Sequence, residues 1–167
     1  MHEHRPDKAE LLQLPEAGAI PNNPRLPVLL HRGAVPPGDP AAAEALFETH
    51  GWRPAWRNGI YHHHHFHSNA HEALAVVSGQ VRVRLGGDPG VTLDLRAGDV
   101  AVLPAGTGHR NLGQSPDLLV VGAYPRGSAA ADHLRGAEDE LEEARESVAA
   151  TPDPPCDPVT GRGYPGA

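Results

Sequence analysis

The chain has 167 residues, a length that suits one domain with its own hydrophobic core. Its formal net charge of −7 has the wrong sign for a protein that works by neutralising phosphates, so we expect no nucleic-acid partner. No stretch approaches the ~18 consecutive apolar residues of a membrane span, and the N-terminal segment lacks the apolar core of a secretory signal, so we expect no membrane partner.

Residues 1–38 are predicted to form an N-terminal arm. Six prolines between positions 15 and 37 prevent a long helix in this region. Residues 25–31 (RLPVLLH) predict a single short edge strand within the arm, because prolines are tolerated mainly at sheet edges.

Residues 39–51 predict a short helix. Asp39 suits the N-cap, Pro40 the first helical position, and Gly51 the left-handed stop that ends many helices. The apolar side chains of this segment fall on one stripe, so we expect the helix to cover one end of the core.

Residues 52–125 show the period-two hydrophobicity of strands and are predicted to form the barrel of the domain. Apolar residues alternate with polar ones on both sides of a Gly-rich turn, at Val81, Val83, Leu85, Val91, Leu93 and Leu95. If the turn pairs these strands directly, Arg82 lies opposite Asp94 on the outer face. Short strands with glycine turns between them indicate an antiparallel sandwich or barrel.

Residues 126–167 are predicted to hold a C-terminal helix and a proline-rich tail. Apolar residues at a spacing of seven among acidic ones predict a helix over 128–150: Leu134, Leu141 and Val148. The tail, residues 151–167, contains five prolines and three glycines, so we expect it to be extended or mobile. Its Cys156, the single cysteine of the chain, is expected to be an idle surface thiol. Because one cysteine excludes an internal disulfide, a reducing compartment is favoured, and we expect the cytoplasm.

Six of the twelve histidines lie within residues 61–72 (YHHHHFHSNAHE). A remnant of an affinity tag and a solvated polar strand without a role are two alternatives, although a tag normally sits at a terminus. Strand parity puts Tyr61 and His63 on one face with His65 and His67, whereas His62, His64 and Phe66 share the other. His65 and His67 can therefore point both imidazoles at a single ion. Beyond a short Ser-Asn turn, Glu72 can bring its carboxylate to the same point.

A further histidine, His109, follows a turn rich in proline and glycine, and with the first cluster it resembles the two signature motifs of the cupin superfamily. The first motif (His-x-His, four residues, Glu, six residues, Gly) is matched by His65, His67, Glu72 and Gly79. The second (Gly, five residues, Pro-x-Gly, two residues, His) is matched by Gly98, Pro104, Gly106 and His109. One departure is Asn111, which lies two residues after the last histidine, where the motif often has asparagine four residues after it.

The flanking sequences WRNGIY, HSNAHE and LPAGTGHRNLG are similar to those of small single-domain bacterial cupins of the YjlB-like family. The resemblance implies an all-β fold, an antiparallel double-stranded β-helix (the cupin jelly-roll barrel) with short peripheral helices. It also implies a metal site formed by His65, His67, Glu72 and His109.

Three imidazoles and one carboxylate suit a borderline divalent transition metal such as Fe, Mn, Ni, Zn or Cu, and they do not suit Ca or Mg. Four protein ligands around an octahedral ion leave two positions open, as a catalytic site requires. A degenerate pocket that holds no metal is the alternative.

For most of the remaining candidate residues, the sequence does not decide between a role at the site and a structural role. His63 is expected either to contact ligands or substrate or to be a plain barrel-wall histidine, and His71 is expected to cap the turn before Glu72. The roles of His62 and His64 stay open. A place at the pocket mouth and a purely structural role are equally compatible with Tyr61, Arg110 and Tyr124. A place in the core and a place in an interface are both compatible with Trp52 and Trp56.

Three functions are compatible with these features. The first is a metal-dependent enzyme, a dioxygenase or an isomerase/epimerase, acting on a small anionic or sugar-like molecule. The second is a non-catalytic metal- or ligand-binding cupin, such as a sensor, which the additional histidines favour. The third, an interaction protein with a vestigial pocket, is disfavoured by the intact set of ligands. The expected partners are a small-molecule ligand or substrate and a second copy, in a homodimer where residues 1–38 contact the partner barrel.

Overall fold

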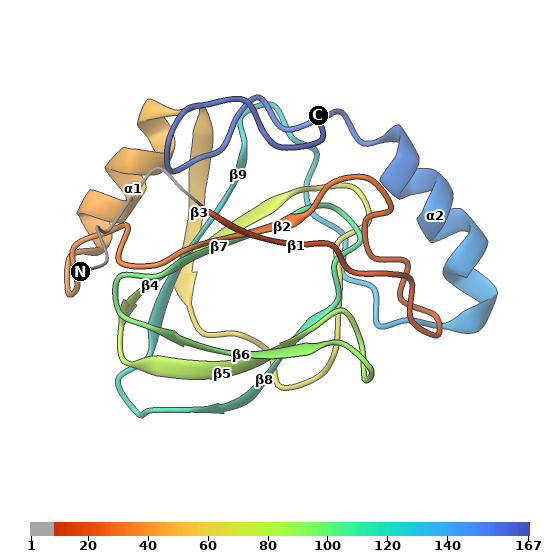
Figure 1. Cartoon of the computed structure of the whole chain (residues 1–167), viewed down its shortest axis with the longest axis horizontal. Coiled ribbons are helices and arrows are strands. Elements are labelled where there is room, and N and C mark those ends of the chain that lie inside the picture. Colours follow the sequence, from red (N-terminus) through yellow and green to blue (C-terminus); the bar gives the residue numbers. More distant parts are fainter. Residues whose placement is uncertain (1–8) are drawn as a thin grey trace.

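The structure is a computed structural model that describes residues 9–167; residues 1–8, the start of the predicted arm, lie outside the described part. Within that part, two sheets face each other across a shared core (Figure 1). The strands are β1 (Glu10–Leu12), β2 (Val28–His31), β3 (Trp52–Asn58), β4 (Glu72–Ser78), β5 (Gln80–Leu85), β6 (Val91–Arg96), β7 (Val100–Leu103), β8 (His109–Gln114) and β9 (Leu119–Pro125).

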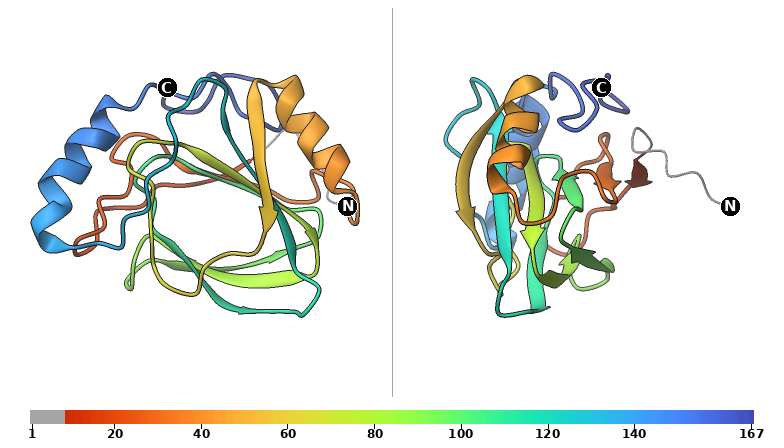
Figure 2. Two further views of the ribbon diagram at one scale, coloured as in Figure 1. Left: turned by 180° about the vertical axis from the view of Figure 1, so that it is seen from behind. Right: turned by 90° about the vertical axis from the view of Figure 1, so that its left-hand side faces the viewer.

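The larger sheet has the order β1-β2-β7-β4-β9-β3 and the smaller one the order β6-β5-β8, and every pairing is antiparallel. This architecture confirms the predicted all-β fold. Two short helices, α1 (Pro40–Thr49) and α2 (Leu141–Ala150), lie on opposite sides of the molecule (Figure 2). Among residues 9–167, no helix is long and apolar enough to cross a bilayer.

The smaller sheet has the predicted register. Leu85 pairs with Val91, so Arg82 lies opposite Asp94, and the guanidinium Nε donates to the carboxylate at 2.9 Å. The apolar members of β5 point into the core, where they meet side chains of the larger sheet. The alternation of apolar and polar residues therefore set which face of this sheet is buried.

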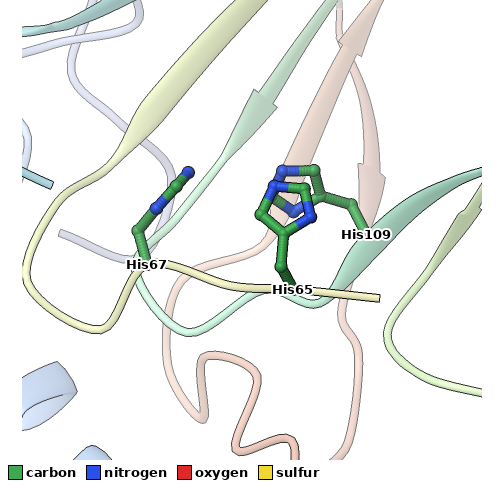
Figure 3. Close-up of side chains that lie close together, drawn as sticks. All are labelled: His65, His67 and His109. Atoms are coloured by element: carbon green, nitrogen blue, oxygen red, sulfur yellow. The ribbon is translucent and has the colours of Figure 1, made fainter. Parts of the chain in front are cut away.

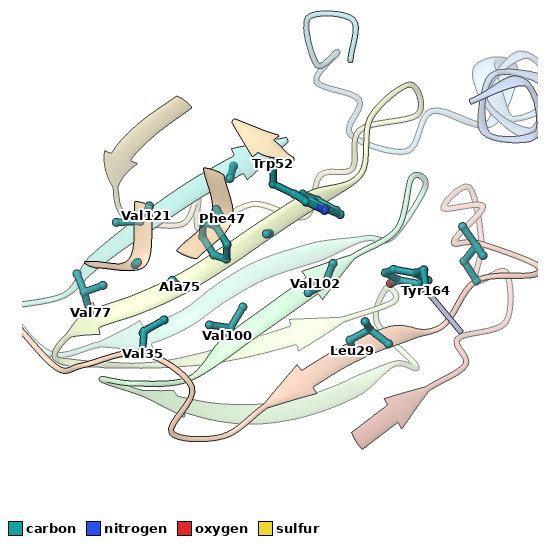
Figure 4. Close-up of a cluster of buried hydrophobic side chains, with 14 residues drawn as sticks. Leu29, Val35, Phe47, Trp52, Ala75, Val77, Val100, Val102, Val121 and Tyr164 are labelled. Atoms are coloured by element: carbon teal, nitrogen blue, oxygen red, sulfur yellow. The ribbon is translucent and has the colours of Figure 1, made fainter. Parts of the chain in front are cut away.

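Strand β4 lies in the middle of the larger sheet and packs on both faces. Ala75 and Val77 lie in a cluster with Phe47 of α1 (Figure 4). Leu74 and Val76 belong instead to the cluster between the two sheets, in the barrel interior. Helix α1 forms as predicted, with the Asp39 carboxylate accepting the Ala42 N–H at 3.0 Å, and it covers this outer face of the sheet. Trp52 is fully buried in the same cluster, which places it in the core.

The arm forms a strand within residues 25–31, as predicted, but the prediction that this strand is single and lies at an edge is wrong. Strand β2 is internal, because β1 pairs with its outer side and β7 with its inner side. The outer strand of the sheet is therefore β1, whose three residues are too few to show a period-two pattern in the sequence.

The predicted helix over 128–150 begins too early. Only Leu141–Ala150 is α-helical, after a 3-10 turn at Glu138–Glu140. The preceding residues 126–137, here called the strap, cross the end of the barrel in a non-helical conformation. Two contacts account for this: Leu134 forms an antiparallel bridge with Phe66, and Gly136 has a φ of +90°, which ends regular helix geometry.

The prediction of an extended or mobile tail is also wrong, since residues 151–167 fold back onto the barrel. Tyr164 is buried in the core cluster of the larger sheet, and its hydroxyl donates to the Pro27 carbonyl at 2.6 Å. The Asp157 carboxylate lies 2.8 Å from His31 Nε2 of β2. A proline-rich segment without periodicity gives no sign of such packing, which depends on contacts more than a hundred residues apart.

Cys156 is half-buried, so it is not the surface thiol that the sequence suggested. Its thiol donates to the His50 carbonyl at 3.1 Å, and its own carbonyl accepts the Trp52 indole N–H at 3.2 Å. Burial raises the pKa of this thiol, with the nearby Asp157 carboxylate adding to the effect. The cysteine therefore helps to hold the tail against α1 and the core.

Candidate metal centre

The site lies at the end of the barrel beneath the strap. His65 and His67 belong to the loop between β3 and β4, Glu72 is the first residue of β4, and His109 is the first residue of β8. The loop is fixed to β8 by a two-way backbone bridge between His65 and His109, with N–H to carbonyl distances of 3.1 and 2.9 Å. Both segments therefore point their histidine side chains into one space (Figure 3).

The histidine loop is not a continuous strand, and its side chains follow the predicted parity except at His62, which lines the same cavity as His65 and His67. Ring-centroid distances of 5.0, 5.6 and 5.5 Å connect Tyr61, His63, His65 and His67 in succession. Phe66 points the other way, into a small cluster with Ile20, Ala144 and Leu134.

The structure brings the four predicted residues together. One ligand nitrogen from each of His65, His67 and His109 lies within 4.8 Å of the other two. The carboxylate of Glu72 lies between two of these rings, with Oε2 at 3.4 Å from His67 Nε2 and Oε1 at 3.4 Å from His109 Nε2. All but His67 are buried, and the His67 side chain is only 12% exposed.

The backbone fixes the tautomer of each of the three rings. In every case the Nδ1–H donates to a backbone carbonyl, which leaves the Nε2 lone pair free to act as an acceptor. The acceptors for His65, His67 and His109 are the carbonyls of His63 (3.2 Å), Asp132 and Thr107 (3.0 Å), respectively. Second contacts of this kind orient metal-binding imidazoles in proteins.

The electrostatics of the site favour an anionic Glu72 carboxylate and a neutral His65 ring. Burial alone would raise the pKa of Glu72, but the adjacent His109 and His67 rings outweigh it, so the pKa falls well below its usual range. Burial, followed by the charge of the neighbouring His109, lowers the pKa of His65 to about 2. Burial opposes protonation of His67 as well, but the Glu72 carboxylate against its ring raises the pKa overall.

Tyr124 of β9 contacts the site directly. The sequence had left its role open between the pocket mouth and a structural position. Its hydroxyl donates to Glu72 Oε2 at 2.8 Å and accepts the Trp56 indole N–H at 3.1 Å. Burial, together with the Glu72 carboxylate, raises the pKa of this phenol, so it stays protonated. Trp56 lies close against Gly122, where an added Cβ would come within 2.0 Å of the indole, so only glycine fits beneath it.

A cavity of about 510 Å³ opens beside the four residues. Besides the site residues, its wall includes Trp56, Ile60, Tyr61, Leu74, Tyr124 and His133. Tyr61 and Tyr124 thus line the pocket, one of the two roles left open for them. Arg110 does not belong to the lining, because it pairs with Arg84 in the register of β5 and β8.

His133 is a pocket residue that the sequence analysis missed. It lies on the strap, its ring stacks on His65 at 4.7 Å with an interplanar angle of 12°, and its Nε2 is 2.9 Å from His63 Nε2. The strap is anchored beside it, where the Asp132 carboxylate accepts the Ser68 N–H at 2.6 Å. Glycines at both ends of this segment, which interrupt a helix, are the sequence signal that would have exposed the error.

The remaining histidines of the run have other partners. The His71 ring accepts the Ala105 N–H at 2.9 Å and donates to the Pro152 carbonyl at 2.8 Å, so it supports the turn before His109 from behind. His64 Nε2 accepts the Gly87 N–H at 3.2 Å on the far face of the loop. His62 lines the cavity.

Asn111 is buried and closes the neighbouring end of β8. Its side-chain amide donates to the Ile60 carbonyl at 3.2 Å and to the Gln114 side chain at 2.6 Å. Its carbonyl oxygen accepts the Gly113 N–H at 2.8 Å. The residue therefore holds the start of the histidine loop against β8 and gives no ligand atom to the cluster.

Two opposed sheets with a His-x-His loop, a glutamate and a distant histidine at one end are the features of a cupin. The cupin-domain family matches residues 57–121. Over 151 residues the chain is 37% identical to the uncharacterized protein YjlB of Bacillus subtilis (strain 168), a match that covers 90% of each chain. This chain therefore belongs to the cupins, and among them to the small bacterial cupins of the YjlB type.

Similar solved structures include an oxalate decarboxylase from Bacillus subtilis with Mn(II) centres, at 20% identity and a TM-score of 0.34, covering 64% of this chain and only 22% of that one. A protein with a double-stranded β-helix domain from Klebsiella pneumoniae is similar at 18% identity and a TM-score of 0.37, covering 68% and 77% of the two chains. A DUF861 family protein from Thermotoga maritima is similar at 16% identity and a TM-score of 0.34, covering 57% and 96%.

Proposed function

We propose that this chain is a metal-binding monocupin in which His65, His67, Glu72 and His109 hold one divalent transition metal, and that it is an enzyme acting on a small molecule. The observation that carries the proposal is the convergence of three imidazole nitrogens whose tautomers are fixed. The reactions that fit such a site are those of a dioxygenase or an isomerase/epimerase.

The donor set fits a metal because the site collects more acceptors than donors: among the described residues, the Tyr124 hydroxyl is the one side chain that donates to the Glu72 carboxylate. Each Nε2 carries a lone pair, and the Glu72 carboxylate 3.4 Å from two of them is also an acceptor. Buried acceptors that face one another are unfavourable unless a proton or a cation lies between them. Three nitrogens and one oxygen suit Fe, Mn, Ni, Zn or Cu, and the identity among these is open.

Such a metal would supply Lewis acidity or oxygen activation at the wall of the cavity. The chain itself would orient the ligands: the three backbone carbonyls hold the imidazoles, and Tyr124 holds the Glu72 carboxylate. The cavity of about 510 Å³ has the size of a small-molecule site.

A non-catalytic, metal- or ligand-binding sensor is the second candidate. It is favoured by the additional imidazoles of His63 and His133 at the pocket mouth, where their Nε2 atoms lie 2.9 Å apart. Such side chains can hold a ligand or a weakly bound ion without taking part in turnover.

Metal analysis of protein purified without a tag tests the proposed site. We expect about one transition-metal ion per chain in the wild type and its loss in His109→Ala, with His64→Ala as the control because His64 bonds to Gly87 on the far face. Metal that persists in His109→Ala would move the binding to the histidine run. Oxygen uptake by the Fe(II)-loaded protein with small carboxylates and phenols then separates a dioxygenase from a sensor, which would bind without turnover.

We further propose a homodimer in which residues 1–38 contact the partner barrel. Support comes from β1, an outer strand of the larger sheet, because no strand among residues 9–167 pairs with its outer edge and Leu11 is 53% exposed. Light scattering at high protein concentration should give twice the chain mass, and a mass near 17.7 kDa would contradict the proposal. The cytoplasm stays the proposed compartment on the basis of the single cysteine, and cell fractionation tests it.

A further inference from the structure

Aromatic and aliphatic side chains form one part of the wall of the cavity beside the candidate metal centre, and Asn58, His62 and Asp132 add polar groups to the rest. Trp56, Tyr61 and Tyr124 supply aromatic rings, and Ile60 and Leu74 supply aliphatic surface. The ring of His133 stacks nearly parallel on His65 at the inner end of the strap. The aromatic part of this wall can contact a flat ring over its faces and edges.

The charged groups of the wall are acidic and already have partners. Glu72 accepts the Tyr124 hydroxyl, and Asp132 accepts the Ser68 N–H and hydroxyl. Among the residues that line this cavity, all within the described part of the chain, neither lysine nor arginine occurs. Arg110, for which the sequence left a place at the pocket mouth open, lies opposite Arg84 in the sheet of β5 and β8.

The charges at the pocket therefore balance when a divalent ion is bound. The two carboxylates of Glu72 and Asp132 contribute two negative charges, which offset the two positive charges of the metal. Arg135 acts electrostatically on His63 and His133 but lies outside the lining, so a substrate carboxylate would add a net negative charge that no lining side chain offsets. A cationic substrate would approach the metal against its charge.

We propose that the pocket takes a neutral, planar aromatic molecule with one carbonyl or hydroxyl oxygen directed at the metal. This inference rests on the proposed metal site and narrows its substrate class. It replaces the anionic or sugar-like molecule suggested by the ligand set alone, because that set says nothing about the wall.

Three isosteric probes test the charge, and a fourth tests the planar ring. The protein is loaded with Co(II), whose visible absorption bands report ligands entering the metal environment, and is titrated with benzamide, benzoate, benzamidinium and cyclohexanecarboxamide. We expect benzamide to bind more tightly than its anionic and cationic counterparts. It should also bind about two- to tenfold more tightly than the non-planar amide, as expected for aromatic contacts of ~0.5–1.5 kcal/mol.

Substitutions in the cavity wall test which residues cause these binding preferences. They leave the four candidate ligands unchanged. Tyr61→Leu should remove much of the advantage of benzamide over cyclohexanecarboxamide, and Tyr61→Phe should retain it. Ala131→Arg puts a cation into the lining and should shift the preference toward benzoate. Ala129→Arg, on the same strap but exposed and outside the lining, is the matched control and should leave the preference unchanged.

The two levels of the proposal fail in different ways. If the protein takes up no Co(II), or His109→Ala takes up as much as the wild type, the metal site itself is wrong. If Co(II) binds through the four residues but benzoate, benzamidinium or cyclohexanecarboxamide binds as tightly as benzamide, the inferred substrate class is wrong. An unchanged preference in Ala131→Arg would likewise overturn it, because the probe would then lie outside this pocket.

Discussion

Two buried histidine–carboxylate clusters occupy different parts of this barrel. They differ in which ring nitrogen of each histidine has a hydrogen-bond partner. In the pair of β2 and the tail, His31 Nε2 lies 2.8 Å from the Asp157 carboxylate, while His31 Nδ1 is buried with no partner among the described residues. In the candidate metal centre each Nδ1 has a carbonyl partner, and the three Nε2 atoms point toward a common space.

The comparison shows that residue type and burial do not by themselves identify a site. His31 and Asp157 form a closed pair that joins β2 to the tail, and the same carboxylate also accepts the Val159 N–H at 2.9 Å. The His31 ring has one nitrogen without a partner, and among the described residues no cluster of ligand groups forms around it. Several fixed lone pairs that meet beside a cavity are the feature that points to a ligand.

The largest expected effect separates the two clusters by metal dependence. Metal at about 100 times its dissociation constant should stabilise the wild type by ~2.7 kcal/mol. For a chain of 167 residues this corresponds to a rise in melting temperature of about 5–11 °C. His109→Ala should abolish this gain and leave the melting temperature of the metal-free protein within a few degrees of wild type, because the barrel has its own core.

Melting curves of the wild type and His109→Ala, with and without metal at neutral pH, measure this effect. The matched variant is His31→Ala, which removes a buried histidine from the closed pair. It should lower the melting temperature of the metal-free protein and keep the full metal-dependent gain. An equal gain in His109→Ala would show that the fixed lone pairs are not the binding site.

The next effect concerns the closed pair alone. Asp157→Ala removes the hydrogen-bond partner of a buried histidine and one contact that holds the tail, which should cost ~1–3 kcal/mol in the free energy of unfolding. Denaturant titration measures the loss, and metal content should not change. An unaltered stability would mean that the other contacts of the tail, those of Tyr164 and Cys156, hold it without the pair.

A smaller effect compares two tyrosine hydroxyls. Tyr124→Phe removes the donor to Glu72, and loss of such a second contact should weaken metal affinity by about tenfold, or ~1.4 kcal/mol. Tyr164→Phe removes a buried hydroxyl from the Pro27 carbonyl, so it should reduce stability without changing affinity. Competition with a chelator gives the affinities, and equal affinities for both variants would exclude a role for Tyr124 in holding the carboxylate.

The sequence predicted the inner part of the site well because its signals are local. Strand parity and motif spacing identified the residues that the structure brings together, and the ion pair of Arg82 with Asp94 followed from the length of one turn. The role of those residues as metal ligands stays a prediction, since convergence alone does not show binding.

The outer wall could not be predicted, because it depends on contacts between distant segments. The sequence did not identify His133, because the apolar residues around it match the period of a helix. In the structure this segment is not helical, because Leu134 forms a bridge with Phe66. The bond from Tyr124 to Glu72 spans 52 positions, and the packing of Tyr164 spans 137. No periodicity along the chain encodes such contacts.

The smallest effect distinguishes the clusters by the pH at which each loses its contribution to stability. Burial would raise the pKa of Asp157, but His31 and the Val159 N–H outweigh it, so the folded pKa lies below the unfolded value of ~3.9. A lowered folded pKa gives stability that is present above the unfolded pKa and is lost as the pH falls through the folded one. Asp157→Asn is neutral at every pH, so its deficit of ~0.5–1 kcal/mol should stay constant near neutrality and shrink below about pH 4. The metal-dependent gain should instead begin to fade at a pH above the usual imidazole pKa of ~6.5, because the raised pKa of His67 lets a proton compete with the metal for its ring. Melting curves in a pH series measure both, and a common pH for the two losses would contradict the separation of a closed pair from a ligand site.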